Sequence, residues 1–193
     1  SKHKFREEKE DGEINFVYGS GSKIPQVFVI HNTVLGPGIG GLRERNYEQR
    51  FGDYYKDAML TDVLRLAESM TYKGAINDTL SGGGKAARNN IILKDEEKKD
   101  KEILRPHEEK RKLAGEELAI ALNAINKKRE ERKVNCYHTA EDMNTGCLDF
   151  DNMYNYCKEN KLKNFAICKS EENAGTGNPS EYTAIGVVES MLE

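Results

Sequence analysis

The chain has 193 residues, enough for one domain with a core of its own. Apolar residues make up 37% of it and charged residues 33%, which is poor in apolar residues for a compact domain but excludes disorder. The net charge of −3 gives no overall attraction to nucleic acid or to an anionic membrane. Residues 1–25 lack a signal peptide's apolar core, and no run approaches the roughly 18 apolar residues of a membrane span. We therefore predict a soluble, cytoplasmic protein.

The first half of the chain predicts a flexible terminus, a strand hairpin and one helix. Residues 1–13 are polar, and we expect them to be flexible. Two apolar runs joined by a Gly/Ser turn predict a hairpin within 14–32, and a short strand is expected at 41–47. The segment 56–70 predicts an amphipathic helix, because its apolar residues repeat with helical spacing. Those residues are Leu60, Val63, Leu64, Ala67 and Met70.

The second half predicts strands that alternate with helices. Strands are expected at 89–93, 134–138 and 165–169, and helices at 113–130 and 148–160. Between them, 94–112 is a run of mixed charge broken by Pro106. Its interleaved acidic residues and its lack of aromatic residues favour a solvated surface over a nucleic-acid partner. The alternation as a whole predicts an α/β sheet covered on its faces.

A last helix is predicted to follow Asn178, which can cap it, with Pro179 at its first position. Glu181 can reach back to the cap, as in a capping box. We expect this helix to continue to Glu193.

The cysteines and histidines show no metal-binding pattern. Cys136, Cys147, Cys157 and Cys168 contain no C-x-x-C pair, and the four histidines contain no pair one helical turn apart. We therefore predict four free thiols and no metal site.

Gly36, Gly38 and Gly41 have the G-x-G-x-x-G spacing of a dinucleotide-binding turn. Such a turn leads straight into a helix whose N-terminus faces the pyrophosphate. Here Pro37 separates the first two glycines, and no helical apolar stripe follows the last. We interpret the spacing as coincidental and the segment as a loop that serves another ligand.

The stretch SGGGKAA, which contains Lys85, resembles a phosphate-binding P-loop only in part. Thr79 stands where a P-loop has its first glycine, and Ala86 stands where it has the Ser or Thr that binds magnesium. No nucleotide-phosphate site is predicted at either glycine-rich stretch.

Lys73, Lys85 and Asp142 fall at the ends of predicted elements, where α/β folds place their sites. Two ammonium groups and one carboxylate can bind a carboxylate substrate and move protons. Glycines beside Lys85 would let a ligand approach the backbone closely. We therefore consider these three residues together as a candidate site.

Five segments, in this order, resemble the Glu/Leu/Phe/Val dehydrogenase family, and leucine dehydrogenase most. They are LGPGIGGLR, DVLRLAESMTYKGA, GGGKA, YHTAEDMNTG and GNPSEYTAIGVVESM. The resemblance implies a three-layer αβα domain with a mixed sheet over 14–179, carrying a charged insert at about 94–112. It also implies a linking helix at 180–193 toward an absent Rossmann domain, which would bind most of the NAD or NADP. A homo-oligomer and an amino acid substrate are implied as well.

The resemblance assigns a role to each matching residue. Lys85 would activate the water that attacks an imine, and Asp142 would exchange protons with the substrate nitrogen. Lys73 would pair with the substrate α-carboxylate, and Thr183 would touch the nicotinamide carboxamide. The other residues of the substrate pocket would be Ile39, Gly40, Gly41, Met70 and Ala140.

Lys85 needs a lowered pKa for this role, because a free lysine titrates near pH 10.4. Burial in a closed cleft and a second ammonium group nearby, that of Lys73, would both lower it. The sequence thus predicts a buried Lys85.

Ile39 and Ala140 bear on the choice of amino acid. Glutamate-using members of the family have a lysine at the position of Ile39, where it pairs with the substrate's second carboxylate. An aliphatic side chain there leaves such a carboxylate buried without a partner, which costs several kcal/mol. We expect leucine, valine or isoleucine as substrate before phenylalanine, and glutamate last.

Two features depart from the family pattern. Asn144 stands where the family usually has glycine, and the segment between Lys85 and Asp142 is longer than in bacterial leucine dehydrogenases. The alternative to an enzyme domain is a non-catalytic binding or oligomerisation module that has kept the fold. Retention of Lys73, Lys85 and Asp142 favours the enzyme.

Overall fold

The computed structural model describes residues 12–17, 19–177 and 179–192. It contains a mixed sheet of five strands in the order β1-β2-β4-β3-β5. The strands are β1 (Glu13–Val17), β2 (Gln26–Asn32), β3 (Gly38–Arg45), β4 (Gly82–Asn89) and β5 (Tyr137–Glu141). The α-helices are α1 (Tyr47–Phe51), α2 (Tyr55–Ile76), α3 (Lys101–Glu131), α4 (Cys147–Glu159) and α5 (Ser180–Leu192).

The sheet combines an antiparallel and a parallel half. β1 and β2 form an antiparallel hairpin, with Ile14 opposite Val29, which confirms the strand pair predicted within 14–32. β2 also pairs antiparallel with β4, whereas β3 runs parallel to both β4 and β5. β3, β4 and β5 therefore point their carboxyl ends to one edge, where open α/β sheets carry their ligands.

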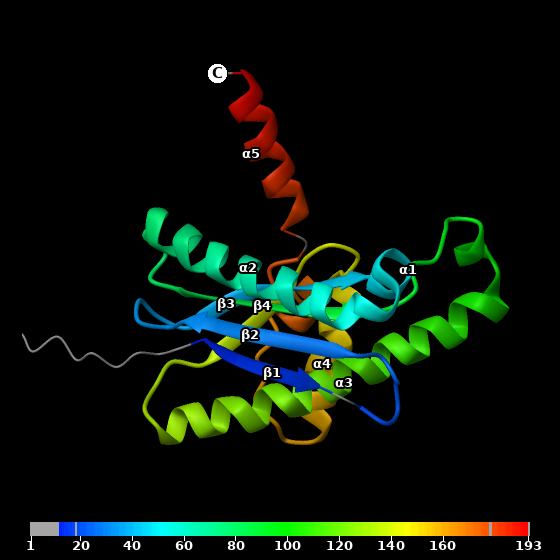
Figure 1. The fold of residues 1–193 in the computed structure, drawn as a ribbon, viewed down its shortest axis with the longest axis horizontal. Helices are drawn as coiled ribbons and strands as arrows, with labels where there is room; N and C mark the ends of the chain where they lie inside the picture. The colour runs from blue at the N-terminus through cyan, green and yellow to red at the C-terminus, as the bar shows by residue number, and fades with distance from the viewer. Residues whose placement is uncertain (1–11, 18, 178, 193) are drawn as a thin grey trace, which may run out of the picture.

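Helices cover both faces of the sheet. Figure 1 shows α2 on one face and α3 and α4 on the other. This arrangement confirms the predicted three-layer αβα domain with a mixed sheet. α5 projects away from these layers.

Two apolar cores follow the alternation of side chains along the strands. Val29 and Ala87 pack under α2, whereas Phe28 and Ala86 pack against α3 and α4. Lys85 lies two residues before Ala87 and therefore faces α2. The α2 face of the sheet thus carries the candidate lysine beside a compact apolar core.

The glycine-rich stretches form strands, which corrects two predictions. The fourth strand is Gly82–Asn89 and not 89–93, where Ile91 is 63% exposed. β3 begins at Gly38, so Gly38 and Gly41 of the glycine motif belong to a strand, and only Gly36 lies in the bend before it. The reason is close packing: a Cβ at Gly83 would lie 2.2 Å from the Thr71 hydroxyl of α2.

Three other boundaries differ from the prediction. The strand expected at 134–138 begins three residues later, as β5, because its register with β3 starts at Tyr137, opposite Gly38. The segment 165–169 makes only one bridge, between Ala166 and Thr139. The helix expected at 56–70 continues to Ile76 and so includes Lys73.

The long helix α3 absorbs most of the predicted charged run. It begins at Lys101, where the Asp100 side chain accepts from the Glu102 N–H, and continues through Pro106. Proline removes the bond that the Glu102 carbonyl would accept, and exposure of Glu102 leaves that carbonyl to water. The run is therefore helical over much of its length, and the helix predicted at 113–130 is the second part of α3.

The remaining elements agree with the prediction where they are described. α4 confirms the helix expected at 148–160, and a last helix is present as α5. The predicted cap at Asn178 and the end at Glu193 lie outside the described residues, as does most of the terminus predicted at 1–13. Among the described helices, none has the length and apolar character needed to span a membrane.

Candidate functional site

Lys85 and Asp142 form the centre of the candidate site. Lys85 lies within β4 and is only 5% exposed, as its predicted role requires. Asp142 directly follows β5, and its Oδ2 lies 3.0 Å from the Lys85 Nζ. The fold thus brings together two residues that are far apart in the sequence, and both lie on the α2 face of the sheet.

Arg43 of β3 shares the same carboxylate oxygen. Its Nε donates to Asp142 Oδ2 at 2.9 Å, and its Nη1 lies 3.1 Å from Asp62 Oδ2 of α2. The Tyr47 hydroxyl also donates to Asp62 Oδ2, at 2.7 Å. Cations and carboxylates therefore alternate from Lys85 through Asp142 and Arg43 to Asp62, which fixes the position of Asp142.

The electrostatics of this cluster suit proton transfer. Burial lowers the pKa of Lys85, and the opposing charge of Asp142 only partly offsets this effect. Burial alone would raise the pKa of Asp142, but the charges and hydrogen bonds of Lys85 and Arg43 outweigh it and lower that pKa. Asp142 is thus held ionised beside a lysine that loses its proton more readily than usual.

The predicted pocket residues lie around this pair. Ile39 of β3 is half-buried and pairs with Gly83 and His138, and Gly41 pairs with Ala140 of β5. By alternation, positions 39, 41 and 43 face the same side as Asp142. The substrate pocket predicted from the resemblance therefore has its β3 and β5 members on the Lys85 side of the sheet.

Met70 and Lys73 belong to the last turns of α2. They follow Asp62 at helical spacing, so they lie on the side of α2 that faces β3. Met70 is half-buried and Lys73 is exposed. Among the described contacts, none joins Lys73 to Lys85 or Asp142, so its place in the substrate site stays a prediction.

Gly40 and Gly41 are required by packing within the protein itself. A Cβ at Gly40 would lie 1.6 Å from the Gly84 carbonyl oxygen, and one at Gly41 would lie 2.7 Å from the Asp142 Cβ. The sheet therefore needs glycine at both positions. Their contact with a substrate remains a prediction.

Within the described part of the chain, Thr183 also makes no contact with the Lys85–Asp142 pair. It lies on α5, and its hydroxyl donates to the Pro179 carbonyl at 3.2 Å within the same segment. Among the described contacts, none joins Thr183 to Lys85 or Asp142.

Sequence reasoning missed Arg43 and Asp62 as members of the site. Arg43 stands in the same GGLR segment as the glycines, and alternation along a strand would have placed it beside Ile39. Asp62 gives no such signal, because its role depends on how α2 lies across β3.

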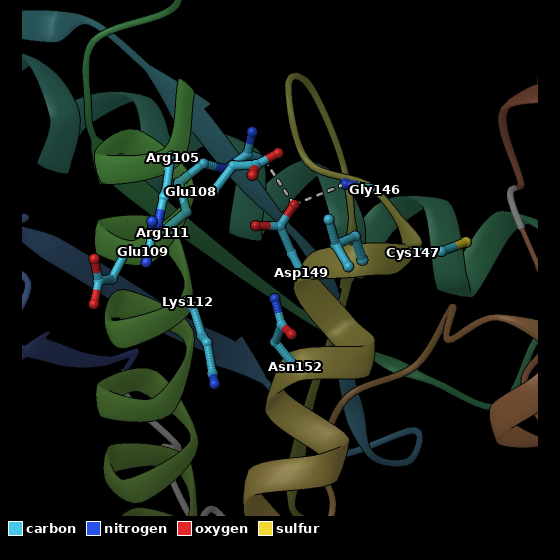
Figure 2. Close-up of a pocket in the computed structure, with 10 residues that line it drawn as sticks. Arg105, Glu108, Glu109, Arg111, Lys112, Gly146, Cys147, Asp149 and Asn152 are labelled. Carbon is cyan, nitrogen blue, oxygen red and sulfur yellow. Dashed lines mark hydrogen bonds and ion pairs between the residues drawn. The ribbon is translucent and has the colours of Figure 1, made fainter. Parts of the chain in front are cut away.

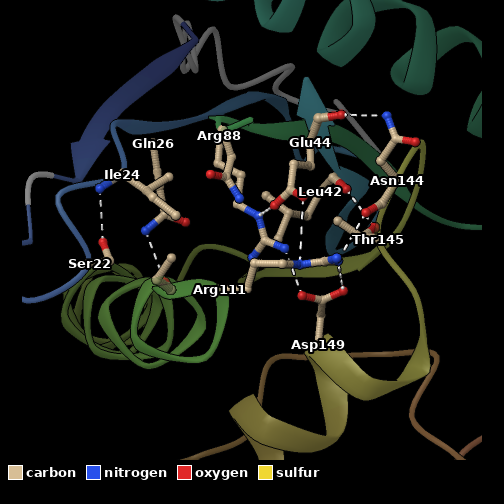
Figure 3. A network of polar contacts seen from close by, with 12 residues as sticks. Ser22, Ile24, Gln26, Leu42, Glu44, Arg88, Arg111, Asn144, Thr145 and Asp149 are labelled. Carbon is tan, nitrogen blue, oxygen red and sulfur yellow. Dashed lines mark hydrogen bonds and ion pairs between the residues drawn. The ribbon is translucent and has the colours of Figure 1, made fainter. Parts of the chain in front are cut away.

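A second charged cluster lies on the opposite face of the sheet (Figure 3). The fully buried Arg88 of β4 pairs with Glu44 of β3 and, at 2.7 Å, with Asp149 of α4. Arg111 of α3 lies 2.7 Å from Asp149 and 3.6 Å from Glu44. Two arginines and two carboxylates thus join two strands and two helices.

A pocket of about 590 Å³ opens beside that cluster, between α3 and α4 (Figure 2). Its walls carry cations such as Arg105 and Lys112 together with the carboxylates Glu108 and Glu109. Asp149 already caps the N-terminus of α4 by accepting from the Gly146 N–H at 3.1 Å. The walls of the pocket therefore carry charges of both signs and do not favour a ligand of either charge. It lies on the face opposite Lys85.

No group of three or more cysteines, histidines or carboxylates that is able to hold a metal ion occurs among the described residues. The four cysteines are free thiols.

The fold and the site define an α/β domain that holds a buried lysine–carboxylate pair on one face of a mixed sheet. Residues 5–159 match the family described as Glu/Leu/Phe/Val dehydrogenase, dimerisation domain. The chain belongs to this family.

Curated relatives support the assignment. The chain is 31% identical over 188 residues to phenylalanine dehydrogenase of Caldalkalibacillus thermarum, covering 97% of this chain and 41% of that protein. It is 29% identical over 188 residues to leucine dehydrogenase of Geobacillus stearothermophilus, covering 97% and 42%. The chain thus spans about two fifths of the length of these relatives.

Solved structures share the fold. The hetero-hexameric glutamate dehydrogenase of Thermus thermophilus superposes with a TM-score of 0.61 at 16% identity, covering 94% of this chain and 40% of that one. L-tryptophan dehydrogenase of Nostoc punctiforme gives 0.52 at 23% identity, covering 80% and 36%. Their substrates differ, so the shared fold alone does not select one.

Proposed function

We propose that this chain is the substrate-binding domain of an NAD(P)-dependent amino acid dehydrogenase. The reaction is the reversible oxidative deamination of a branched-chain L-amino acid, leucine favoured, to a 2-keto acid and ammonia. The observation that carries the proposal is the buried Lys85 Nζ, 3.0 Å from Asp142 Oδ2, on the face that also carries Ile39 and Ala140.

In this mechanism Lys73 pairs with the substrate α-carboxylate at the mouth of the site. Asp142 exchanges protons with the substrate nitrogen, and Lys85 withdraws a proton from the water that attacks the imine. The lowered pKa of Lys85 raises the fraction of neutral amine, the form that acts as a base. The Asp142 carboxylate, 3.0 Å away, stabilises the ammonium group that forms when Lys85 takes up that proton.

NAD or NADP would supply the hydride acceptor for this reaction. Within this chain only Thr183 carries an assignment to it, and one exposed hydroxyl is a contact and not a binding site. We therefore assign most of the cofactor site to a Rossmann domain outside this sequence. α5 is the proposed link to that domain, because its described side chains are exposed and many are apolar.

The substrate preference rests on Ile39 and Ala140. Both present apolar surface on the Lys85 face, which favours a branched aliphatic side chain over a carboxylate. We also propose a cytoplasmic homo-oligomer, consistent with the dimerisation domain that the family description names. A non-catalytic module with the same fold is the competing possibility.

The test has two parts. First, the 193-residue chain is titrated with leucine, valine, phenylalanine and glutamate while NMR follows the signals of Lys85, Ile39 and Ala140. Second, amino-acid-dependent reduction of NAD and NADP is measured on the longest natural polypeptide that contains this chain. We expect leucine to shift all three signals and to support turnover.

Lys85→Ala should lower turnover by about 100-fold or more, because it removes the base that activates water. Lys101→Ala, at the exposed start of α3, is the matched control and should leave the rate unchanged. Near-normal turnover in Lys85→Ala, with an unaltered fold, contradicts the mechanism. Binding of amino acids without turnover in the longer polypeptide would favour the non-catalytic module.

A further inference from the structure

The loop that carries Asp142 is held to β3 on one side. The Thr145 hydroxyl donates to the Leu42 carbonyl at 2.8 Å and accepts from the Asp142 N–H at 3.0 Å. The Glu44 N–H donates to the Met143 carbonyl at 2.9 Å. These bonds attach the loop to β3. All of them come from β3 or from within the loop itself.

Asn144, at the tip of this loop, has a left-handed backbone with φ +60°. Asparagine tolerates this conformation better than most residues, although glycine adopts it freely. Its side-chain amide donates to the Glu44 carbonyl at 3.0 Å, a bond that glycine does not provide. The departure from the family pattern at this position therefore adds a contact.

Arg111 holds the loop from the other side. One of its nitrogens, Nη2, donates to the Asn144 carbonyl at 3.0 Å and to Asp149 Oδ2 at 2.7 Å (Figure 3). The same guanidinium lies 3.6 Å from Glu44. Arg111 comes from the charged run 94–112, so this segment reaches the loop that carries a site residue.

The two carboxylates that bind Arg111 are themselves held in place by a second arginine. Asp149 and Glu44 are also bound by Arg88, which is fully buried and links them beneath the sheet. Burial alone would raise the pKa of Asp149, but Arg88 and Arg111 outweigh it and lower that pKa, so Asp149 stays ionised. Charge-assisted bonds of this kind are short and resist displacement.

We propose that Arg111 is a positioning residue for Asp142: from the charged segment of α3 it fixes the loop 142–146 so that Asp142 stays in contact with Lys85. This inference rests on the proposed function for its catalytic meaning. The clamp itself is defined by contacts in this chain and can be measured without a substrate.

The test compares Arg111→Met, Arg111→Lys and the control Arg105→Met in the 193-residue chain. Arg105 also lies on α3 and lines the neighbouring pocket. Within the described part of the chain it forms no ion pair. Amide hydrogen exchange at Asp142, Gly146 and Glu44 should accelerate about tenfold or more in Arg111→Met, the factor expected for one lost charge-assisted bond. The control should leave these rates unchanged.

NMR titration of the Lys85 ammonium gives the second readout, and its sign separates two explanations. Loss of a distant positive charge alone would raise the pKa of Lys85. A loop that swings away removes Asp142, which supports the charged form, and so lowers that pKa. Besides Asp142, the charged groups that act on Lys85 are Arg43 and Asp62, and these remain in place.

We expect the pKa of Lys85 to fall in Arg111→Met and to fall less in Arg111→Lys, because lysine keeps one of the donor contacts. A rise, or no change, overturns the proposal, as does unchanged exchange in the loop. If Arg111→Met does not fold, Arg111→Lys carries both measurements, and a pKa and exchange rates equal to the parent chain's then overturn it. Failure of the parent chain to bind any amino acid would count against the proposed function and not against the clamp.

Discussion

Ile39 faces the candidate site from the strand that carries Arg43. It lies between Gly83 of β4 and His138 of β5, on the Lys85 face of the sheet, and is half-buried. Neither neighbour across the sheet brings a fixed charge: Gly83 has no side chain, and burial lowers the pKa of His138 and favours its neutral form. The position therefore favours an apolar substrate group.

Ile39→Lys tests this at the scale of one side chain. A lysine there would place an ammonium group where we propose the substrate's branched side chain binds, so kcat/KM for leucine should fall about tenfold or more. The measurement is leucine-dependent reduction of the nicotinamide cofactor by the longest natural polypeptide. Ile91→Lys, at a residue 63% exposed, is the control and should not change it. An unchanged leucine preference in Ile39→Lys would mean that residue 39 does not face the substrate.

The β3–β4 pair depends on glycine for its closeness. Gly40 lies against the Gly84 carbonyl, and Gly82 lies against the Asn32 carbonyl of β2, where an added Cβ would come within 2.0 Å. The strands that carry Arg43 and Lys85 therefore meet through glycines. The spacing between these two cations depends on the same contacts.

Gly40→Ala should consequently destabilise the sheet and not simply alter a ligand pocket. The new methyl group would force β3 away from β4, at a cost of about 3 kcal/mol in the free energy of unfolding, measured in urea. Gly186→Ala is the control, because no heavy atom lies within 4 Å of the Cβ position there. A Gly40→Ala protein of parental stability would show that the strands can separate without loss.

The elements and the site were predictable to different degrees. The hairpin and α4 follow from local apolar patterns, and these were correct. β4 was missed because Gly82, Gly83 and Gly84 give no strand signal, although close packing against α2 and β5 requires them. Tertiary contact, which the sequence does not display, decides such segments.

The site shows the same division. Lys85 and Asp142 were predicted together from their motifs, and the fold brings them into contact. Arg43 and Asp62 were not predicted. Alternation along the strand from Ile39 was enough to find Arg43, whereas the role of Asp62 arises only when α2 lies across β3. Arg111 of the helix α3 contacts Asn144 of a loop that lies 33 residues further along the chain, and no local sequence pattern predicts this contact.

On the scale of the whole molecule, α5 stands apart from the three layers (Figure 1). None of its described residues is buried, and Ile185, Met191 and Leu192 are between 59% and 80% exposed. An apolar helix that remains in water contributes little to the stability of the body it projects from, since stability follows the apolar area removed from water. Removal of α5 should therefore leave the free energy of unfolding of the five-stranded sheet and its covering helices almost unchanged.

A chain shortened to residues 1–180 tests this. It keeps Ser180, whose hydroxyl lies 3.2 Å from Glu141, and loses the rest of α5. The free energy of unfolding in urea should change by less than about 0.5 kcal/mol, the range of surface changes. Fluorescence of an apolar dye bound to the folded protein should fall, because the exposed apolar side chains of α5 are gone. A loss of more than about 1 kcal/mol would instead mean that α5 packs against the sheet layers in solution, and its proposed role as a link to a cofactor domain would then fail.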